Sequence, residues 1–352
     1  MNMRIVKSIG KGIEKTVILV VITCMFVLFT NKEAYSLDTI TLGTGTPGGG
    51  FILYGDTFAR IINAGDISLL IRPQNTNGSN ENLQLLESGK LDIALVQGEA
   101  VYEAFSGNSR PPAKLKIIAP MYATPGMFVV RGDSPYRTIN DLKGKRVAFG
   151  ARGSGLVILA RYILDGIGLD QQKHFQAIYL DRAGDGPSML ADGRVDALWG
   201  GGVGWPGFTV VSKTQVGSRF IAPDAGEISR ILKKYRFLKQ MTVPANSYPH
   251  QNSTITSVGS WSFILARSKL PQDVAYRIVR ALHQGETQMC NALPQACATT
   301  VVNLEAVTPR PELIHPGVMR YLLELREIRE TPGTVNYPGN EKSTGQPVRA
   351  AP

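Results

Sequence analysis

The residues best suited to specific chemistry lie near the start of the chain, at positions 43–50. They read Gly-Thr-Gly-Thr-Pro-Gly-Gly-Gly and follow the apolar run 39–42. A strand that leads through a glycine-rich turn into a helix gathers unpaired backbone N–H groups and the positive end of the helix dipole. The pattern therefore predicts an anion-binding turn, and its Gly-x-Gly-x-x-Gly spacing also fits a dinucleotide-binding turn.

The residues around this turn favour a small anion over a dinucleotide. A dinucleotide-binding unit places an acidic residue about 20 positions further on, at the end of the second strand. Here that strand ends in Arg72-Pro73, which leaves an NADP-type site as the alternative. Pro47 also removes an N–H group from inside the turn. We therefore expect the turn to hold a carboxylate rather than a pyrophosphate.

No local motif for catalysis or for a metal site stands out in the sequence. The four histidines are scattered, and none belongs to a His-Glu-x-x-His motif. Gly153-Ser154-Gly155 lacks the spacing of a hydrolase nucleophile elbow. Carboxylates that meet only in the folded chain leave glycoside chemistry open as an alternative. We expect binding without chemistry, and therefore no catalytic residue, no metal and no cofactor.

Residues 1–36 have the pattern of an export signal. A basic start is followed by the apolar run 16–30 and by small residues at Ala34 and Ser36. The run is short of the roughly 20 apolar residues that a membrane span needs. Cleavage near Ser36 is therefore predicted, and an uncleaved anchor is the alternative.

Charge and cysteine content narrow the function classes further. The net charge is +10, but the basic residues are scattered rather than gathered with aromatic residues, so we expect no nucleic-acid partner. Two cysteines remain after cleavage, Cys290 and Cys297. In an oxidising compartment this pair predicts one disulfide, and two reduced thiols on one helix face are the alternative.

The apolar pattern alternates between strands and helices, which predicts an α/β fold with parallel sheets covered by helices. Strands are expected at 39–43, 67–72, 92–96, 116–121, 127–131, 146–149, 177–180, 195–199, 219–222 and 260–266. Helices are expected at 51–64, 79–88, 99–105, 138–142, 154–168, 185–192, 225–234, 271–288 and 316–330. The tail 331–352, rich in Pro, Gly and Asn, is expected to be disordered.

One sequence pattern occurs twice along the chain. Segment 83–95 reads as an apolar helix end, a glycine, a basic residue and an apolar strand that carries an aspartate, and segment 188–198 repeats that order. A second glycine-rich turn, at 150–155, precedes the second copy as the first turn precedes the other. Ligands of open α/β sheets bind beyond the carboxyl ends of the strands. We therefore expect two similar α/β lobes that face each other across one ligand cleft.

Seven groups of residues form an ordered set across nearly the whole chain after residue 36. They are Gly43-Thr44-Gly45 with Gly48-Gly49, Thr76-Asn77-Gly78-Ser79 with Glu81-Asn82-Leu83, 91–97, 141–147, Gly150 with Gly153-Ser154-Gly155, Tyr248-Pro249 and His315-Pro316-Gly317. This set resembles the TAXI subgroup of solute-binding proteins, which serve tripartite ATP-independent periplasmic (TRAP) transporters.

The resemblance implies a type II periplasmic-binding-protein fold with two hinged lobes. Residues 37–131 with 251–330 are expected to form lobe 1, and 132–250 lobe 2. The expected protein is a monomeric periplasmic receptor that closes on a small carboxylate, such as an amino acid or a dicarboxylate, and delivers it to the membrane subunits of a TRAP transporter. An exported α/β enzyme acting on a small organic acid, and a binding fold used for sensing or adhesion, are the alternatives.

The resemblance also carries the family's binding positions onto Thr44, Gly48, Gln97, Tyr122 and Ser154. For the hydroxyl and glutamine positions, plain turn or helix-cap chemistry is the alternative. Where the family usually has an aromatic pair and a proline after the first turn, this chain has 51–53, Phe-Ile-Leu. The change suggests an acidic solute with a more apolar body.

Four further binding residues are expected from their own chemistry. Thr46 offers a hydroxyl in the first turn, and Arg152 offers a guanidinium for bidentate pairing with a carboxylate. Trp199 and Trp205 flank a glycine-rich segment after a strand and are expected to form the floor of the cleft. An exposed charge for the arginine and core packing for the tryptophans are the alternatives.

Overall fold

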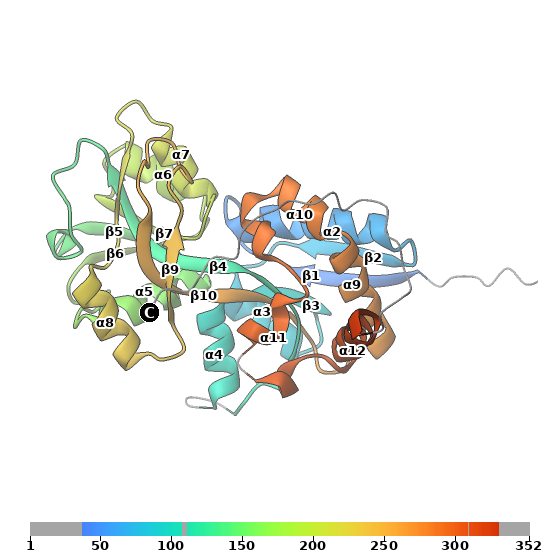
Figure 1. The fold of residues 1–352 in the computed structure, drawn as a ribbon. Helices are drawn as coiled ribbons and strands as arrows, with labels where there is room; N and C mark the ends of the chain where they lie inside the picture. The colour runs from blue at the N-terminus through green and yellow to red at the C-terminus, as the bar shows by residue number, and fades with distance from the viewer. Residues whose placement is uncertain (1–36, 108–110, 309, 331–352) are drawn as a thin grey trace, which may run out of the picture. The chain divides into compact units, whose positions relative to one another are not determined.

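The computed structural model describes residues 37–107, 111–308 and 310–330 (Figure 1). From Thr39 onward the chain forms one compact unit. The predicted export signal, 1–36, and the predicted disordered tail, 331–352, lie outside the described residues. The parts that position the candidate site are a mixed sheet and the helices at its strand ends.

The strands form one ten-stranded mixed sheet in the order β2-β1-β3-β10-β4-β7-β5-β6, with β8 paired to β4 and β9 to β10. The strands are β1 (Asp38–Gly43), β2 (Leu69–Gln74), β3 (Ile93–Val96), β4 (Lys116–Arg131), β5 (Arg146–Ala151), β6 (Gln176–Leu180), β7 (Ala197–Gly201), β8 (Ser218–Ile221), β9 (Lys239–Val243) and β10 (Ile255–Ala266). β1 is parallel to β3, and β5 is parallel to β6 and β7. β4 and β10 are antiparallel to each other, and both run from one half of the sheet into the other (Figure 1).

Helices follow most strands, as the α/β pattern predicts. They are α2 (Gly50–Gly65), α3 (Ser79–Glu87), α4 (Gly98–Ser106), α5 (Gly155–Gly166), α6 (Asp185–Ala191), α7 (Pro206–Ser212), α8 (Ala225–Lys234), α9 (Gln272–Gln284), α10 (Glu286–Ala292), α11 (Asn303–Val307) and α12 (Pro316–Glu330). Short 3-10 turns lie at Asn140–Leu142, Pro294–Ala298 and Pro311–Leu313. The structure joins Cys290 in α10 to Cys297 in the second of these turns by a disulfide.

Two departures from the expected elements have physical causes. The expected strands 116–121 and 127–131 are one strand, β4, because Pro125 and Gly126 continue the ladder instead of turning. A Cβ on Gly126 would lie 2.6 Å from the Trp199 ring, so the glycine makes room for a buried indole. The expected helix 271–288 is divided into α9 and α10 at Gly285.

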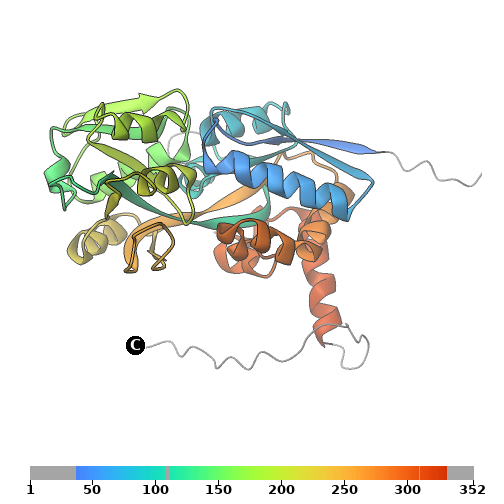
Figure 2. The ribbon, with the colours of Figure 1, turned by 90° about the horizontal axis from the view of Figure 1, so that it is seen from above.

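Buried side chains gather around two centres, and we call the elements around them the first and second lobe. The first core comes from β1, β2, β3, α2, α4 and the returning elements β10, α9 and α12. The second lobe has cores on both faces of β5 and β7, one under α5 and α8 and one under α6 and α7. Figure 2 shows the second lobe in green and yellow beside the first. The expected division at 131/132 and 250/251 stays a prediction.

The repeated sequence pattern has the same structural role in both lobes. Asp92, before β3, accepts hydrogen bonds from the backbone N and Oγ1 of Thr41 in β1, each 2.9 Å. Asp196, before β7, accepts from the backbone N of Arg146 in β5 at 2.9 Å and from its guanidinium. Burial by itself raises the pKa of Asp92, but the bonds from Thr41 and Arg267 outweigh it, so that pKa lies below its usual value. Each aspartate therefore ties the strand that follows it to the first strand of its lobe.

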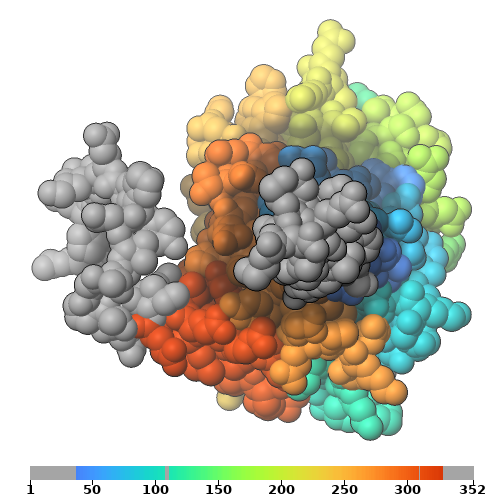
Figure 3. Space-filling view, turned by 90° about the vertical axis from the view of Figure 1, so that its right-hand side faces the viewer, coloured from blue at the N-terminus to red at the C-terminus, as the bar shows by residue number. Residues whose placement is uncertain are grey.

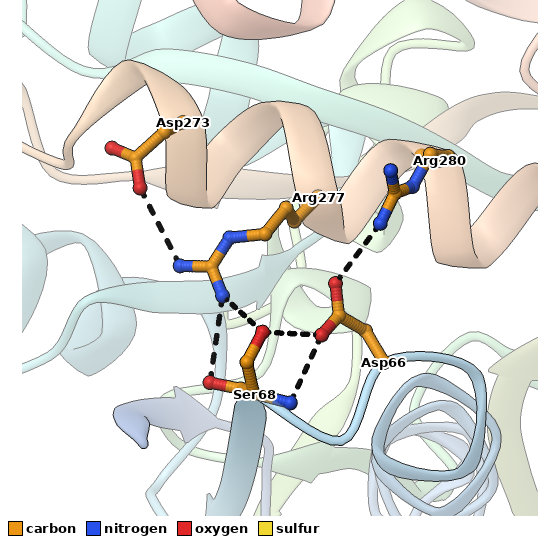
Figure 4. A network of polar contacts seen from close by, with 5 residues as sticks. All are labelled: Asp66, Ser68, Asp273, Arg277 and Arg280. Atoms are coloured by element: carbon orange, nitrogen blue, oxygen red, sulfur yellow. Dashed lines mark hydrogen bonds and ion pairs between the residues drawn. The ribbon is translucent and has the colours of Figure 1, made fainter. Parts of the chain in front are cut away.

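The C-terminal elements complete the first lobe. α9 packs on α2 and α12, and Figure 3 shows these C-terminal elements, in orange and red, beside the blue N-terminal ones. In Figure 4, Arg277 of α9 donates to the Ser68 Oγ at 2.6 Å, and Arg280 pairs with Asp66 at 3.3 Å. Asp66 and Ser68 lie between α2 and β2. This polar network holds α9 against the start of the lobe, away from the strand ends that carry the site.

Candidate functional site

A cavity lies between the two lobes where the two glycine-rich turns meet. Its lining residues are Gly45, Thr46, Gly49, Gly50, Phe51, Asn77, Gly78, Ser79, Gln97, Tyr122, Thr124, Gly150, Ala151, Ser154, Leu156, Leu180, Ala183, Leu198, Gly201 and Trp205. The cavity volume is about 60 Å³, and one water molecule needs roughly 10–15 Å³. The cleft as it stands therefore has room only for a small molecule.

The first glycine-rich turn places the start of α2 in the wall of this cavity. α2 begins after Gly49 with no side-chain cap and no acidic residue in its first turn. Gly50 and Phe51, its first residues, line the cavity. Thr44 holds the turn in place, because its N and its Oγ1 both donate to the Gln74 carbonyl at 3.0 Å. The helix start therefore presents unpaired N–H groups to the cavity, as the sequence predicts.

The second glycine-rich turn does the same from the opposite lobe. Ser154 is the N-cap of α5 and accepts a hydrogen bond from the Leu156 backbone N at 3.2 Å. The alternative role of this serine, a helix cap, is thus present. Its hydroxyl proton remains able to donate, and Ser154 lines the cavity. α5 also has no acidic residue in its first turn, so the positive end of its dipole faces the cavity without a charged partner from that turn.

Two buried side chains with hydrogen-bond donors, Gln97 and Tyr122, line the cavity. Gln97, which follows β3, is 4% exposed, and its Nε2 has no hydrogen-bond partner in the described chain. Leaving such a donor unpaired costs about 1–3 kcal/mol. Burial, followed by the nearby Tyr54, raises the pKa of Tyr122, so its phenol stays a neutral donor. The structure brings both predicted residues to the cavity.

Beside the polar side chains of Thr46, Asn77, Ser79 and Thr124, the remaining lining is largely apolar. Trp205 is 7% exposed, and its ring packs against the edge of Phe208. Leu156, Leu180 and Leu198 line the same cavity. None of the twenty lining residues carries a charged side chain. The cavity thus combines backbone and neutral side-chain donors with an aliphatic and aromatic surface.

Four sequence-predicted binding residues do not line the cavity. Thr44 is 1% exposed and makes the turn contacts described above. Trp199 is fully buried in the second core, where its Nε1 donates to the Leu156 carbonyl at 2.8 Å. Gly48 lies at the rim with φ 82° and faces the other lobe. In this structure they belong to the scaffold around the cavity, and their contact with a ligand stays a prediction.

Arg152 is the fourth of these residues. It is exposed, and its guanidinium lies 5.9 Å from the centre of the Tyr179 ring. It lines a separate surface recess with Arg161. In the turn between β5 and α5, the Arg152 side chain points away from the cavity. The exposed-charge alternative therefore describes Arg152 in this structure.

Sequence reasoning missed several lining residues. Asn77, Gly78 and Ser79 open α3, and the Ser79 Oγ accepts from the Gln97 backbone N at 3.0 Å. This segment was in the ordered motif set but carried no assigned role. Ala183 also lines the cavity, and it follows β6 in a segment without any distinctive pattern.

Hydrogen bonds join the two lobes around the cavity. The Ala183 N donates to the Thr46 Oγ1 at 3.2 Å, and the Gly184 N donates to the Pro47 carbonyl at 3.0 Å. On the other rim the Asn80 N donates to the Gly153 carbonyl at 3.2 Å. The lobes thus touch directly on two sides of the cavity, which is a closed arrangement of the cleft.

Further out, side chains of α4 and α5 continue the contact between the lobes. Glu103 accepts hydrogen bonds from Arg161 and, at 2.9 Å, from the Tyr162 hydroxyl. The Tyr102 ring stacks on Phe237 with centres 3.8 Å apart. These contacts cross the same boundary as the backbone bonds at the rim.

Solved structures share this fold. The periplasmic binding protein BugD matches with a TM-score of 0.53 at 13% identity over 82% of this chain and 96% of its own. A structure described as a periplasmic transporter matches with a TM-score of 0.52 at 14% identity over 83% and 96%. MatC from Rhodopseudomonas palustris with bound malate matches with a TM-score of 0.51 at 14% identity over 83% and 96%. The fold is the α/β, two-lobed type II fold of periplasmic binding proteins, as predicted.

The family follows from the sequence comparison. The model of the NMT1-like family matches residues 42–325, so the chain belongs to that family. The finer resemblance, to the TAXI subgroup, stays a prediction. Among the described residues no helix combines the length and apolar character of a membrane span, and no cluster of three or more potential metal ligands occurs.

Proposed function

We propose that the protein is an extracytoplasmic solute-binding receptor that captures a small carboxylate by closure of its two lobes. The observation that carries this proposal is the cavity between the two lobes, whose wall holds the starts of α2 and α5 together with the buried Gln97 and Tyr122 side chains. A carboxylate in this cavity accepts hydrogen bonds from the two helix starts. The family and the fold support a binding role.

Delivery to a TRAP-type secondary transporter is the second part of the proposal. It rests on the ordered motif set, together with export of the chain and cleavage near Ser36. In this proposal the protein acts as a periplasmic monomer, and β4 and β10 form the hinge because they run through both lobes. The closed form is the one that the membrane subunits recognise.

We also propose that the protein is not an enzyme. General acid–base catalysis needs a titratable side chain within reach of the substrate. The residues that line the cavity include no His, Cys, Asp, Glu or Lys, and burial raises the pKa of the lining Tyr122 so that its phenol keeps its proton. The Ser154 hydroxyl, one of the hydroxyls that line the cavity, has the Leu156 N–H as its partner rather than a base.

The test begins with the native protein purified from its exported form. Denaturation followed by mass spectrometry identifies any retained solute, and a thermal-shift screen of organic acids reports ligands that stabilise the folded state. A retained or stabilising carboxylate supports the receptor. If no acid shifts the midpoint and no solute is retained, the proposal is overturned. Uptake of the identified solute by proteoliposomes with TRAP membrane subunits, with and without this protein, tests delivery.

A further inference from the structure

We infer that the cleft selects a monocarboxylate with a short apolar body and rejects amino acids and dicarboxylates. The inference rests on the proposed receptor function and adds the solute class. It follows from three features of the cavity: two helix starts without an acidic residue in their first turns, the buried neutral side chains of Gln97 and Tyr122, and a lining without charged side chains.

One part of the cavity is built for a single carboxylate. A Cβ on Gly155, the first residue of α5, would lie 3.0 Å from the Gln97 Oε1, so the glutamine amide adjoins that helix start. A Cβ on Gly50, the first residue of α2, would lie 3.5 Å from the Tyr122 hydroxyl. Of these two groups, the Tyr122 hydroxyl beside α2 is a donor, whereas the Gln97 atom nearest α5 is the acceptor Oε1. One carboxylate therefore accepts from the Tyr122 hydroxyl and from the backbone N–H groups of the two helix starts, without a cationic side chain.

The same lining has no charged side chain to pair with a second charge. An amino acid brings an ammonium group, and the lining has no carboxylate to pair with it. Glu99 is the acid nearest in sequence to Gln97, but it is fully buried behind the lining and its Oε1 accepts from the Ser260 hydroxyl at 2.7 Å. A dicarboxylate brings a second anion, and Arg152 is turned to the surface over Tyr179. An enclosed charge without a partner is strongly disfavoured.

The apolar part of the lining fits a hydrocarbon body. Trp205, Leu180, Leu198 and Leu156 form that part of the wall together with Phe51. Apolar surface gains free energy when it leaves water for such a wall. The volume of about 60 Å³ limits the body to a short chain.

The experiment compares three probes with one carbon skeleton: pentanoate, its 2-amino derivative norvaline, and the dicarboxylate glutarate. Calorimetry on the mature protein is expected to show binding of pentanoate or of a neighbour in the series from propanoate to hexanoate. Norvaline and glutarate are expected to bind about 100-fold more weakly or not at all, which corresponds to the loss of a charge partner. Equal or tighter binding of norvaline or glutarate overturns the inference and leaves the receptor function standing.

A charge-insertion variant tests the reason for the selectivity. Phe51 is half-buried at the cavity wall, and Phe51→Arg is expected to strengthen glutarate binding at least about tenfold relative to pentanoate. Phe51→Leu is the matched control and keeps the preference for pentanoate. Unchanged preference in a folded Phe51→Arg protein contradicts the inference. Failure of every carboxylate to bind, with no retained solute, overturns the receptor function itself and the inference with it.

Discussion

Replacing Gly153 by alanine tests whether closure of the lobes supplies binding energy. Gly153 belongs to the second lobe, and its carbonyl accepts from the Asn80 N of the first lobe at 3.2 Å. A Cβ on Gly153 would lie 2.4 Å from the Asn77 carbonyl oxygen across the cleft. The lobes must then part by about 1 Å to regain ordinary contact. Because this clash exists only when the cleft is shut, the open form is unaffected.

The magnitude follows from the contacts that are lost. The steric overlap costs about 1–3 kcal/mol, and the hydrogen bond at the rim contributes about 1 kcal/mol. Together they disfavour the closed form by about 2–4 kcal/mol, which weakens solute binding by about 30- to 700-fold. Calorimetry with the solute identified by mass spectrometry measures the affinity, and small-angle X-ray scattering follows closure.

Gly184→Ala is the matched control for this experiment. Gly184 also faces the other lobe at the rim, but a Cβ there would lie 3.4 Å from the Gly48 Cα and 3.4 Å from the Pro47 carbonyl oxygen. This variant should bind within about threefold of the wild type. Equal affinities for Gly153→Ala and Gly184→Ala would refute the reasoning. The reasoning would also be refuted if the Gly153→Ala protein without solute lost as much unfolding free energy, in kcal/mol, as it loses in binding free energy.

Three further predictions concern single side chains. Gln97→Leu removes the unpaired amide, so the solute-free protein should be at least as stable as the wild type. Its solute affinity should fall about tenfold or more. Thermal unfolding measures the change in stability, and calorimetry measures the change in affinity. Replacing Cys290 and Cys297 by alanine opens a loop with a sequence separation of 7 and should cost about 2 kcal/mol of unfolding free energy in denaturant titration, with solute affinity unchanged. Burial raises the pKa of Glu99 to about 7 from 4.5, so the folded state holds its proton where the unfolded state has lost it. The wild type should therefore lose stability as pH rises from about 4.5 to 7, by up to about 3 kcal/mol. Glu99→Gln should lack that loss when melting is compared at low and high pH.

Each of these three predictions is contradicted by one particular result. A Gln97→Leu protein with wild-type affinity shows that the amide makes no solute contact. A cysteine variant that loses solute affinity in proportion to stability shows that the disulfide supports the cleft. A Glu99→Gln protein that melts with the same pH profile as the wild type shows that the buried carboxyl does not hold a proton in the folded state.

The sequence predicted most of the elements because their signals are local. Glycine-rich turns after apolar strands require backbone freedom and a helix start at the same place, and both turns have that form in the structure. The paired aspartates Asp92 and Asp196 sit in a repeated pattern and make the same strand-to-strand bonds. By contrast, Pro125-Gly126 has the local signal of a turn, yet contact with Trp199 keeps it inside β4.

Site residues were predictable where the backbone alone places them. Gln97 directly follows β3 and Ser154 directly precedes α5, so the ends of these elements bring both residues, which the family resemblance had named, to the cavity. Side-chain direction has no such rule. Arg152 and Trp199 each directly follow a residue that lines the cavity, Ala151 and Leu198 respectively. The Arg152 side chain nevertheless extends into solvent, and the Trp199 side chain extends into the core.

The sequence by itself determined the strand–turn–helix units, the repeat of the lobe pattern and the two helix starts that favour an anion. Those features depend on residues close together in the chain, where backbone sterics and hydrogen bonding act. Only the tertiary structure decided that the lining is uncharged and that the lobes meet at Gly153 and Gly184. These properties arise where chain segments far apart in sequence pack against each other, since packing decides which side chains reach the cavity and which remain outside it.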